Sequence, residues 1–528
     1  MKITRHISVL LLIAYSSSFI ISCRNEEYSK ITKFSDLYSP KSKINFSNSS
    51  GIYKNEELSI SITDSNATDL VVINSDDSLF YCGSSFTYKL KSINPSISFI
   101  PTASKNYENY AHSWSEPIGD FSTFHQIKVI SYNNDSLIDS AIGNYVLGAS
   151  SFDSLPIINL KIDNYLLFSQ DSGCYVPGNS FDKSDDQNTG NFHIYKKRKQ
   201  LGSIQIIDGE NEYLNGDYLF RIHGYITPLS PQKGLRFYIK EYTQINKLMN
   251  LDHSVDKIIL RSSFSGWGSE IFVDGWIADV CSSLNLDVMA YLPTKVYLNG
   301  EYWGIHGLRE RMDLKAISNK YDLKLKSIID ADDKGYSKKN GYGELNQLIL
   351  KIKSNPSLPF KEVKDQFKIK SLIDWLVVEL FFQNDDWPCN NTFFWKQTKK
   401  SKKWKAVLID MDACVGSPKK DMFSIATKER SPALGGVLIT YLLNQSEFQE
   451  LFKLRVKYLF TNELSKKNLL SKLNNYKIWF EPVVEQHYRR WGDPYGMDKY
   501  NNGIKRIEDF CNKRHEYFII NMNNYFNK

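Results

Sequence analysis

"IKSLIDWLVVELFFQNDDWPCNNTFFWK", residues 369–396, joins an apolar run to a cluster of oxygen-bearing side chains. Residues 369–383 are mostly apolar and long enough for a buried helix, and aspartates and asparagines follow at once. Further along, "VLIDMDACVG" at 407–416 places two more aspartates at the end of an expected strand. These side chains belong either to two ordinary loops, since turns favour Asp and Asn, or to a site for a divalent cation and an anion.

Composition limits the classes of protein to consider. With 528 residues, 42% of them hydrophobic and 24% charged, the chain is long enough for about two to four folded domains and is not expected to be disordered. The formal charge of +7 comes from Lys and Arg spread along the chain without a long basic block, so we expect no nucleic-acid partner. Apart from Cys23, the cysteines stand far apart without zinc-ligand spacing, which argues against a zinc site.

The first 23 residues, "MKITRHISVLLLIAYSSSFIISC", have the pattern of an export signal. A basic start precedes an apolar stretch that is too short and too rich in serine to span a membrane. Cys23 follows a small residue and resembles the lipidated cysteine of a bacterial lipoprotein. We therefore expect a signal peptide at 1–22, lipid on Cys23, a polar tether at 23–44 and no transmembrane helix in the mature chain. This implies a cell-envelope protein anchored to a bacterial membrane, at the outer membrane or cell surface. The alternative is an ordinary secretory signal with an incidental cysteine.

The rest of the chain divides into three regions by its pattern. Residues 45–150 contain short stretches of alternating apolar and polar residues separated by turns, such as "LSISITD" at 58–64, which predicts an Ig-like β-sandwich. Residues 155–315 are rich in expected strands, and 316–528 are mainly helical. The predicted fold is multidomain: an all-β Ig-like sandwich, then an α+β domain of two lobes with the polar motifs at their junction.

The spacing within the acidic motifs is that of a phosphoryl-transfer site. Such a site needs hard oxygen ligands for a divalent metal and a carboxylate that orients or deprotonates the nucleophile. Asp386 stands five positions before Asn391, as do a kinase base and its metal-binding asparagine. Because Asp385 and Asn390 have the same spacing, the register stays open by one residue.

Three motifs occur in a fixed order: "VYLNGEYWGIHGLRERMD" at 296–313, "NDDWPCNNTFFWK" at 384–396 and "KKWKAVLIDMDACVG" at 402–416. Together they resemble the CotH kinase family. The resemblance runs from about residue 155 to the C-terminus, and it implies an atypical, secretory-type kinase fold that binds ATP and Mg²⁺ or Mn²⁺. The region before it resembles the chitobiase-type Ig-like domain that precedes such modules in membrane lipoproteins.

The resemblance assigns roles in the two acidic loops. Asp386 corresponds to the catalytic base, and Asn391 and Asp410 correspond to metal ligands. Asp412 is the second choice of ligand, because we expect it to point away from Asp410 if the strand continues.

The resemblance also assigns residues that bind the nucleotide from the strand-rich lobe. The segment "GYITPLSPQKGLRFYIK", residues 224–240, matches the family's lysine segment and indicates Lys233 as the phosphate contact. Glu310 is the expected partner that holds Lys233 extended, and Arg311 is a further phosphate contact. A solvated lysine and a surface salt bridge are the alternatives.

The resulting functional hypothesis is an ATP-dependent protein kinase. It would phosphorylate Ser or Thr of exported or surface proteins. Two alternatives stay open: a catalytically degenerate kinase-fold lipoprotein that acts in binding or surface assembly, and nucleotidyl transfer to protein.

Overall fold

The computed structural model describes residues 42–527, except for 76, 93–116, 118, 149–154, 186–187, 225–227, 229, 240–243, 333–340, 400–401, 430–433 and 492–495. Cys23, the signal peptide and almost all of the tether therefore lie outside the described residues. Among the helices it describes, none combines the length and the apolar character that crossing a membrane requires. The six cysteines among the described residues are free thiols.

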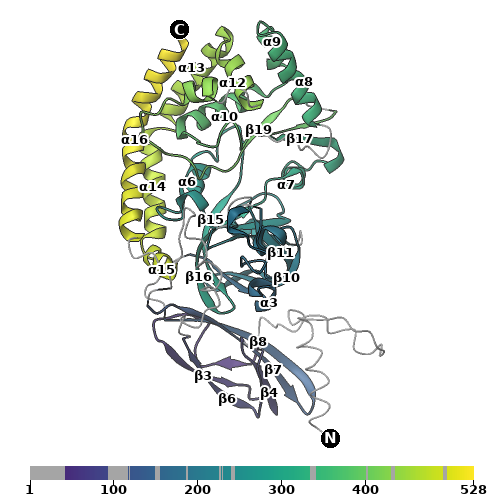
Figure 1. Ribbon diagram of the computed structural model, residues 1–528. Coiled ribbons are helices and arrows are strands. Elements are labelled where there is room, and N and C mark those ends of the chain that lie inside the picture. The colour runs from purple at the N-terminus through teal and green to yellow at the C-terminus, as the bar shows by residue number, and fades with distance from the viewer. Residues whose placement is uncertain are drawn as a thin grey trace.

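The N-terminal strands form two facing sheets, drawn at the bottom of Figure 1. One sheet has the order β1 (Asn45–Phe46), β3 (Glu57–Thr63), β6 (Ser85–Lys91). The other has the order β5 (Leu79–Cys82), β4 (Asp69–Ile73), β7 (Thr123–Asn133), β8 (Ser136–Leu147), β2 (Gly51–Tyr53), with β2 parallel to β8. Buried side chains from both sheets, including Ile60, Leu90, Val72 and Val129, share one core. This region is therefore an all-β unit of two layers.

The strand-rich lobe is a closed barrel. Its strands are β13 (Lys257–Arg261), β12 (Gly234–Tyr238), β11 (Asn211–His223), β10 (Gln200–Asp208), β9 (Ile157–Lys161), β15 (Tyr291–Leu298) and β16 (Glu301–Glu310), in this order. β13 also pairs with β16, with Leu260 opposite Leu308, so the ring closes. Closure satisfies the backbone hydrogen bonds that an edge strand would leave open. Apolar side chains such as Phe237 and Ile258 fill the interior.

The barrel adjoins the N-terminal unit and carries short helical segments between its strands. Glu301 of β16 pairs with Thr123 of β7, and the hydroxyls of Ser122 and Tyr297 are 2.8 Å apart. The segments between the barrel strands are α3 (Asn164–Phe168), η4 (Lys183–Asp185), α4 (Asn191–Ile194), α5 (Ile245–Leu248) and η6 (Phe264–Gly266).

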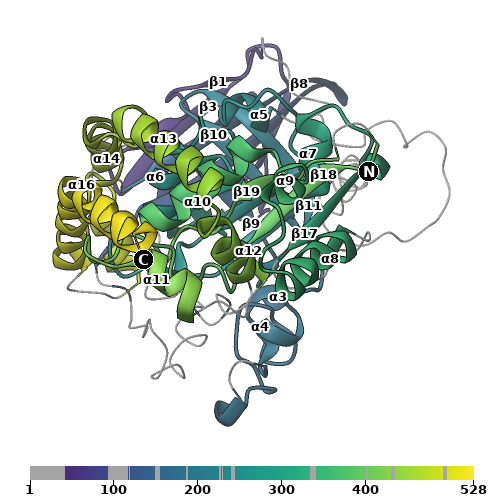
Figure 2. The same cartoon turned by 90° about the horizontal axis from the view of Figure 1, so that it is seen from above.

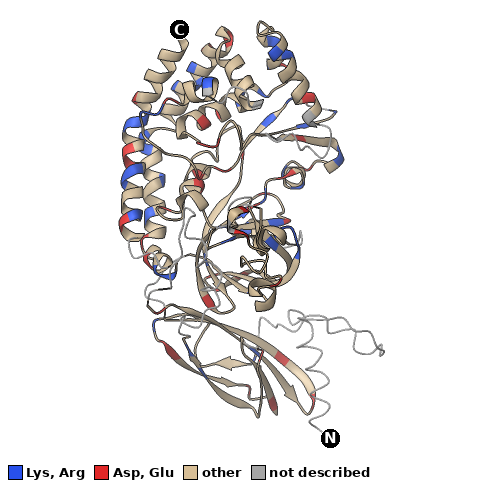
Figure 3. Ribbon diagram, in the orientation of Figure 1, with Lys and Arg blue, Asp and Glu red and all other residues tan. Residues whose placement is uncertain are grey.

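The C-terminal region is mainly helical around α10 (Ile369–Phe382), which lies among the other helices in Figure 2. The other helical elements are α7 (Leu314–Lys320), η7 (Leu325–Ser327), α8 (Gly341–Ser354), α9 (Phe360–Lys364), α11 (Met422–Ser424), η8 (Ile425–Glu429), α12 (Leu434–Leu443), α13 (Ser446–Thr461), α14 (Lys466–Phe480), α15 (Val484–Arg490) and α16 (Gly496–Phe526). Along α14 and α16, which run side by side on one flank, Figure 3 shows basic and acidic residues interspersed.

The barrel and the helical region exchange a segment of chain. α6 (Val273–Val280) leaves the barrel and packs into the core of the helical region, where Trp276 stacks edge-on against Phe382 of α10. The following β14 (Asp287–Val288) joins the small sheet β14–β19–β18–β17 of that region, formed with β19 (Lys405–Leu408), β18 (Phe393–Gln397) and β17 (Ile328–Asp332). The chain then returns to the barrel through β15. This exchange fixes the strands of one part against the loops of the other.

Candidate functional site

The first acidic loop starts at the end of a fully buried helix. α10 (Ile369–Phe382) is buried on all sides from Ser371 onward and is mostly apolar, as expected for a helix surrounded by core. It ends at Gln383, whose φ of 63° lies in the left-handed region, and the chain turns into residues 384–391. Asn384 is buried, and its side-chain oxygen accepts a hydrogen bond from the backbone N–H of Asp386 at 3.2 Å. The side chain of Asp386 is exposed, so a substrate can reach it.

The second acidic loop follows β19 and is held against the first. Asn391 and Asp410 both have left-handed backbones, with φ of 64° and 57°. Such a conformation costs about 1 kcal/mol at a residue other than glycine, so other contacts must stabilise it. The side-chain amides of Asn384 and Asn391 each donate to the backbone carbonyl of Asp410 at 3.4 Å. These contacts hold the two loops together.

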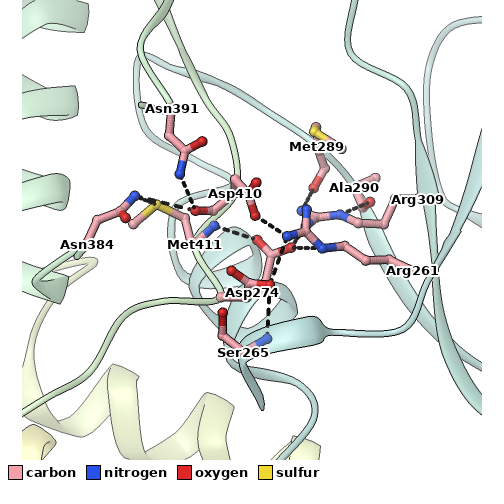
Figure 4. Close-up of polar contacts among 11 residues, drawn as sticks. Arg261, Ser265, Asp274, Met289, Ala290, Arg309, Asn384, Asn391, Asp410 and Met411 are labelled. Carbon is pink, nitrogen blue, oxygen red and sulfur yellow. Dashed lines mark hydrogen bonds and ion pairs between the residues drawn. The ribbon is translucent and has the colours of Figure 1, made fainter. Parts of the chain in front are cut away.

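Arg261, the last residue of β13, brings carboxylates of the second loop together. Its Nη2 bonds Asp410 and lies 3.0 Å from Asp412, and its Nε lies 3.5 Å from Asp274 of α6 (Figure 4). Asp274 also forms an ion pair with Arg309 of β16. Two barrel arginines and three aspartates thus form one ionic network at the junction of the two regions.

Asp274 ties this network to the backbone of the second loop. Its Oδ1 accepts a hydrogen bond from the Met411 N–H at 3.1 Å. Arg309 also donates to the carbonyls of Met289 at 2.8 Å and Ala290 at 3.4 Å. Asp274 and Arg309 are only 3% and 2% exposed, so each depends on the other for its charge to be tolerated.

The pKa values of Asp274 and Asp410 are shifted in opposite directions. Burial tends to raise the pKa of Asp274, but the guanidinium groups of Arg309 and Arg261 hold it below its ordinary value. The pKa of Asp410 is raised, first by burial of its site and then by the charges of Asp412 and Asp274, against the attraction of Arg261. These carboxylates raise the pKa of Arg261 well above its ordinary value.

The donor atoms of the two loops fit a hard divalent cation. Asp410, Asp412 and the side-chain oxygen of Asn391 are the oxygen ligands that Mg²⁺ or Mn²⁺ prefers. The two carboxylates converge on one guanidinium, so they lie close enough to share a cation. In the part of the chain that the structure describes, no three His, Cys, Asp or Glu side chains are grouped as a metal site. Because Asp410 and Asp412 both bond Arg261, a cation would compete with Arg261 for these carboxylates.

Two residues of the acidic motif have contacts with later parts of the chain. Asn391 is the residue whose amide contacts the Asp410 carbonyl, whereas Asp385 forms an ion pair with Lys420. Asn391, five positions after Asp386 in the chain, therefore lies against Asp410 of the second loop.

The prediction that Asp412 points away from Asp410 is wrong, because both carboxylates reach Arg261. β19 ends at Leu408, and the left-handed backbone of Asp410 breaks the strand geometry. Even in a continued strand, residues two positions apart share a face.

Lys233 lies in the interior of the barrel lobe. It is 1% exposed, and its Nζ donates to the Ser230 carbonyl at 2.9 Å and lies over the rings of Tyr175 and Phe192 at 4.9 and 5.2 Å. Burial lowers the pKa of Lys233 to about 7. Its ammonium group is therefore enclosed by aromatic rings and a carbonyl.

The expected pair of Lys233 and Glu310 is not formed. Glu310 contacts the imidazole Nε2 of His253 at 2.8 Å, and this contact is the main cause that raises the pKa of His253. Each side chain has another partner: Lys233 is held by the Ser230 carbonyl, and Glu310 by the imidazole of His253.

Arg311 stands on the opposite face from Glu310 and lies near the network. Its backbone N–H donates to the Lys257 carbonyl at 3.0 Å. Burial lowers the pKa of Arg311, while the charges of Asp313 and Asp410 oppose this change. Arg311 is thus within electrostatic reach of Asp410.

Sequence reasoning missed Arg261, Asp274 and Arg309 as members of the site. The sequence does contain a signal for two of them, since Arg261 and Asp274 are charged residues in buried, largely apolar elements. These elements are "KIILR" for Arg261 and "VDGWIADV" for Asp274. Charged residues in such elements are rare unless they are paired.

Comparison with known proteins identifies the family. The model described as "CotH kinase protein" matches residues 220–518, more than half of the chain, and includes both acidic loops and Arg261. No curated protein matches the sequence. Among solved structures, the chain resembles "Crystal structure of A Helicobacter pylori proinflammatory kinase CtkA" with 12% identity over 56% of this chain and 92% of that chain, at a TM-score of 0.24, which is too low to establish a shared fold. The chain belongs to the CotH kinase protein family, and this membership supports an atypical kinase activity.

Proposed function

We propose that this protein transfers the terminal phosphate of ATP to Ser or Thr hydroxyls of exported proteins. The observation that supports this proposal most is the convergence of Asp410 and Asp412 on one point, beside the loop of Asp386 and Asn391. Phosphoryl transfer requires positioning and charge stabilisation more than covalent chemistry. A junction between two regions that presents fixed carboxylates and arginines supplies both.

The acceptor hydroxyl oxygen forms a bond to the γ-phosphorus of ATP, and the bond from that phosphorus to the β–γ bridging oxygen breaks, so that ADP leaves. Asp386, which is exposed, accepts the hydroxyl proton. Asn384 positions Asp386 through its hydrogen bond to the backbone N–H.

Asp410, Asp412 and Asn391 would hold the divalent metal. When bound, the metal supplies neutralisation of phosphate charge. Arg261, which bonds both carboxylates in the structure, would then lie beside the metal as a cation for the phosphate groups.

The proposal also includes a location at the cell envelope and a role for the N-terminal unit as a spacer. A lipid on Cys23 would anchor the mature chain to the cell envelope and bring the kinase close to exported or surface proteins. The two facing sheets, with β2 parallel to the last strand β8, support an Ig-like spacer between that anchor and the barrel.

A second candidate is a binding protein on a kinase scaffold that does not turn over ATP. Two observations favour it: Asp410 and Asp412 already hold Arg261, and Lys233 does not reach Glu310.

ATP labelled at either the α- or the γ-phosphate distinguishes these functions. The full chain would be incubated with Mg²⁺ or Mn²⁺ and a Ser- and Thr-rich acceptor protein. Phosphoryl transfer moves only the γ-label, and nucleotidyl transfer moves the α-label. We expect γ-label in the acceptor, and about 10²-fold or greater loss in Asp386→Asn.

Asp365→Asn is the matched control, because Asp365 stands in an exposed pair with Lys403 at 3.8 Å. It should keep full activity. Absence of either label, with ATP still raising the thermal stability of the protein, would reject the enzyme and leave the binding protein. Loss of activity in Asp385→Asn but not in Asp386→Asn would show that Asp385, and not Asp386, is the catalytic base.

A further inference from the structure

The outer face of the barrel carries a row of basic residues across four strands. Arg221 of β11 stands opposite Arg236 of β12, Arg236 stands opposite Ile259 of β13, and Ile259 stands opposite Arg309 of β16. Directly opposed residues of paired strands share a face of the sheet. Arg261 lies two residues after Ile259 and so belongs to the same face. This face therefore borders the ionic network.

Carboxylates neutralise some of these cations. Arg309 pairs with Asp274, and Arg261 pairs with Asp274, Asp410 and Asp412. Lys257, at the other end of β13, pairs with Asp256 at 2.8 Å and Asp313 at 3.2 Å.

Arg221 and Arg236 have neutral partners instead. The Nε of Arg221 donates to the Tyr238 hydroxyl at 3.0 Å, and Arg236 donates to the Nδ1 of His223 at 2.7 Å. The Nε of Arg236 is buried and has no hydrogen-bond partner. Within the residues that the structure describes, neither arginine has a carboxylate at ion-pair distance.

The cations of this face repel one another. After burial, the charges of Arg311 and Arg221 are the largest causes that lower the pKa of Arg236, to about 10. Burial and the surrounding arginines lower the pKa of His223 well below its ordinary value, so its imidazole is neutral. Since Arg236 donates to Nδ1, that imidazole has its proton on Nε2. The cluster thus consists of three close guanidinium groups and a neutral histidine.

We propose that Arg221, Arg236 and Arg311 form a binding site for a polyphosphate chain, namely the triphosphate of the nucleotide. Guanidinium groups match phosphate oxygens in forked hydrogen bonds, and an anion with several charges would relieve their mutual repulsion. Arg261 lies on the same face of the barrel and bonds Asp410 and Asp412, so a chain of phosphates can extend along this face from the arginines to the second acidic loop. The inference rests on the proposed function only for the identity of the anion.

Strand alternation explains why these arginines, and not Lys233, reach the phosphates. Leu235 and Phe237 of β12 face the barrel interior, so Arg236 between them faces outward. Lys233 has the parity of the interior residues, and its Nζ lies against the buried ring of Tyr175.

The test uses inorganic tripolyphosphate, without metal, titrated into the full chain in a calorimeter. Arg221→Gln and Arg236→Gln should each weaken binding about tenfold or more, since each removes charge-assisted hydrogen bonds. Arg198→Gln is the control, because Arg198 is exposed and stacks on Tyr195. It should bind as the wild type does.

Two further measurements separate the possible failures. Both variants lose a repulsive charge, so their thermal transitions should not fall; a loss of folding would contradict the inferred repulsion. Equal tripolyphosphate affinity in all proteins would overturn the site. If tripolyphosphate binding weakens but γ-label transfer from ATP does not, the anion is not the nucleotide's triphosphate. If the wild type transfers no label yet binds tripolyphosphate through Arg221 and Arg236, the proposed function fails and the site stands.

Discussion

Asp274 offers the sharpest test of the ionic network, because one substitution removes its charge and keeps its size. Asp274→Asn leaves Arg309, which is 2% exposed, without its anionic partner. Arg261 keeps two carboxylates, Asp410 and Asp412. The substitution therefore mainly leaves the buried guanidinium of Arg309 without a neutralising charge.

The expected cost follows from burial. Removing one partner of a buried ion pair destabilises a protein by about 3–5 kcal/mol. An asparagine oxygen at position 274 can still accept the hydrogen bond from the Met411 N–H, which is 3.1 Å in the wild type. We therefore expect the lower end of this range, about 3 kcal/mol in the free energy of unfolding.

Urea unfolding followed by tryptophan fluorescence measures this change. Nine of the ten tryptophans lie at or after Trp267, so the signal reports mainly on the barrel and helical regions. Because a chain of several domains need not unfold in one step, the midpoint of this fluorescence transition is the quantity to compare. Hydrogen exchange of the Met411 amide gives a second, local readout.

Asp279→Asn is a matched control on the same helix. Asp279 pairs with Lys472 at 2.8 Å, but its side chain is 39% exposed, so the substitution should cost less than about 1 kcal/mol. If Asp274→Asn shifts the midpoint no more than Asp279→Asn does, the buried network stabilises the protein no more than a surface ion pair. This result would refute the expected cost of leaving Arg309 unpaired.

Three further predictions concern buried ionisable groups and use the same urea assay. Burial raises the pKa of Glu379 well above its ordinary value, so the folded state keeps a proton that the unfolded state loses above about pH 4.3. The stability of the wild type should therefore fall as pH rises above this value, by up to about 1.4 kcal/mol per pH unit. Glu379→Gln should remove this dependence on pH. Burial lowers the pKa of Lys233 to about 7, so the wild type should gain stability between about pH 7 and 10, where only the unfolded state still holds this proton. Lys233→Met should remove this gain and leave tripolyphosphate binding unchanged. Arg514→Lys should cost about 2–4 kcal/mol, because lysine cannot donate to all the carbonyls that buried Arg514 binds at the end of α10 and in the loop before α11.

Local patterns in the sequence predict elements whose partners are near in the chain. The apolar run at 369–383 predicts a buried helix, and the structure has α10 at Ile369–Phe382. The strand expected before Asp410 is β19, which ends two residues before it. In both cases apolar periodicity and the polar residues that end it suffice.

Closure of the barrel could not be predicted in this way. It depends on β13 meeting β16, with Ile258 opposite Glu310, and on β9 lying parallel to β15, with Ile157 opposite Lys295. Alternation states which residues share a face, but it does not state which strands pair across such separations.

Alternation was nevertheless enough to doubt the role of Lys233. In "KGLRFY" at 233–238, the apolar Leu235 and Phe237 occupy one face of the expected strand, and Lys233 has the same parity. A lysine on that side is directed into the core, while Arg236 is directed outward. The motif names Lys233, whereas parity places Arg236 on the outward face of the same segment.

The ionic network shows where such local reasoning ends. Arg261 and Asp410 are separated by 149 positions, and the sequence around either residue does not predict the other as its partner. A charged residue in a buried element does indicate that a partner of opposite charge exists. The partner is set by the exchange of α6 and β14 between the two regions, which places Asp274 between the barrel arginines and the second acidic loop. The residues of the site are thus visible in the sequence as anomalies, and their assembly is a property of the topology.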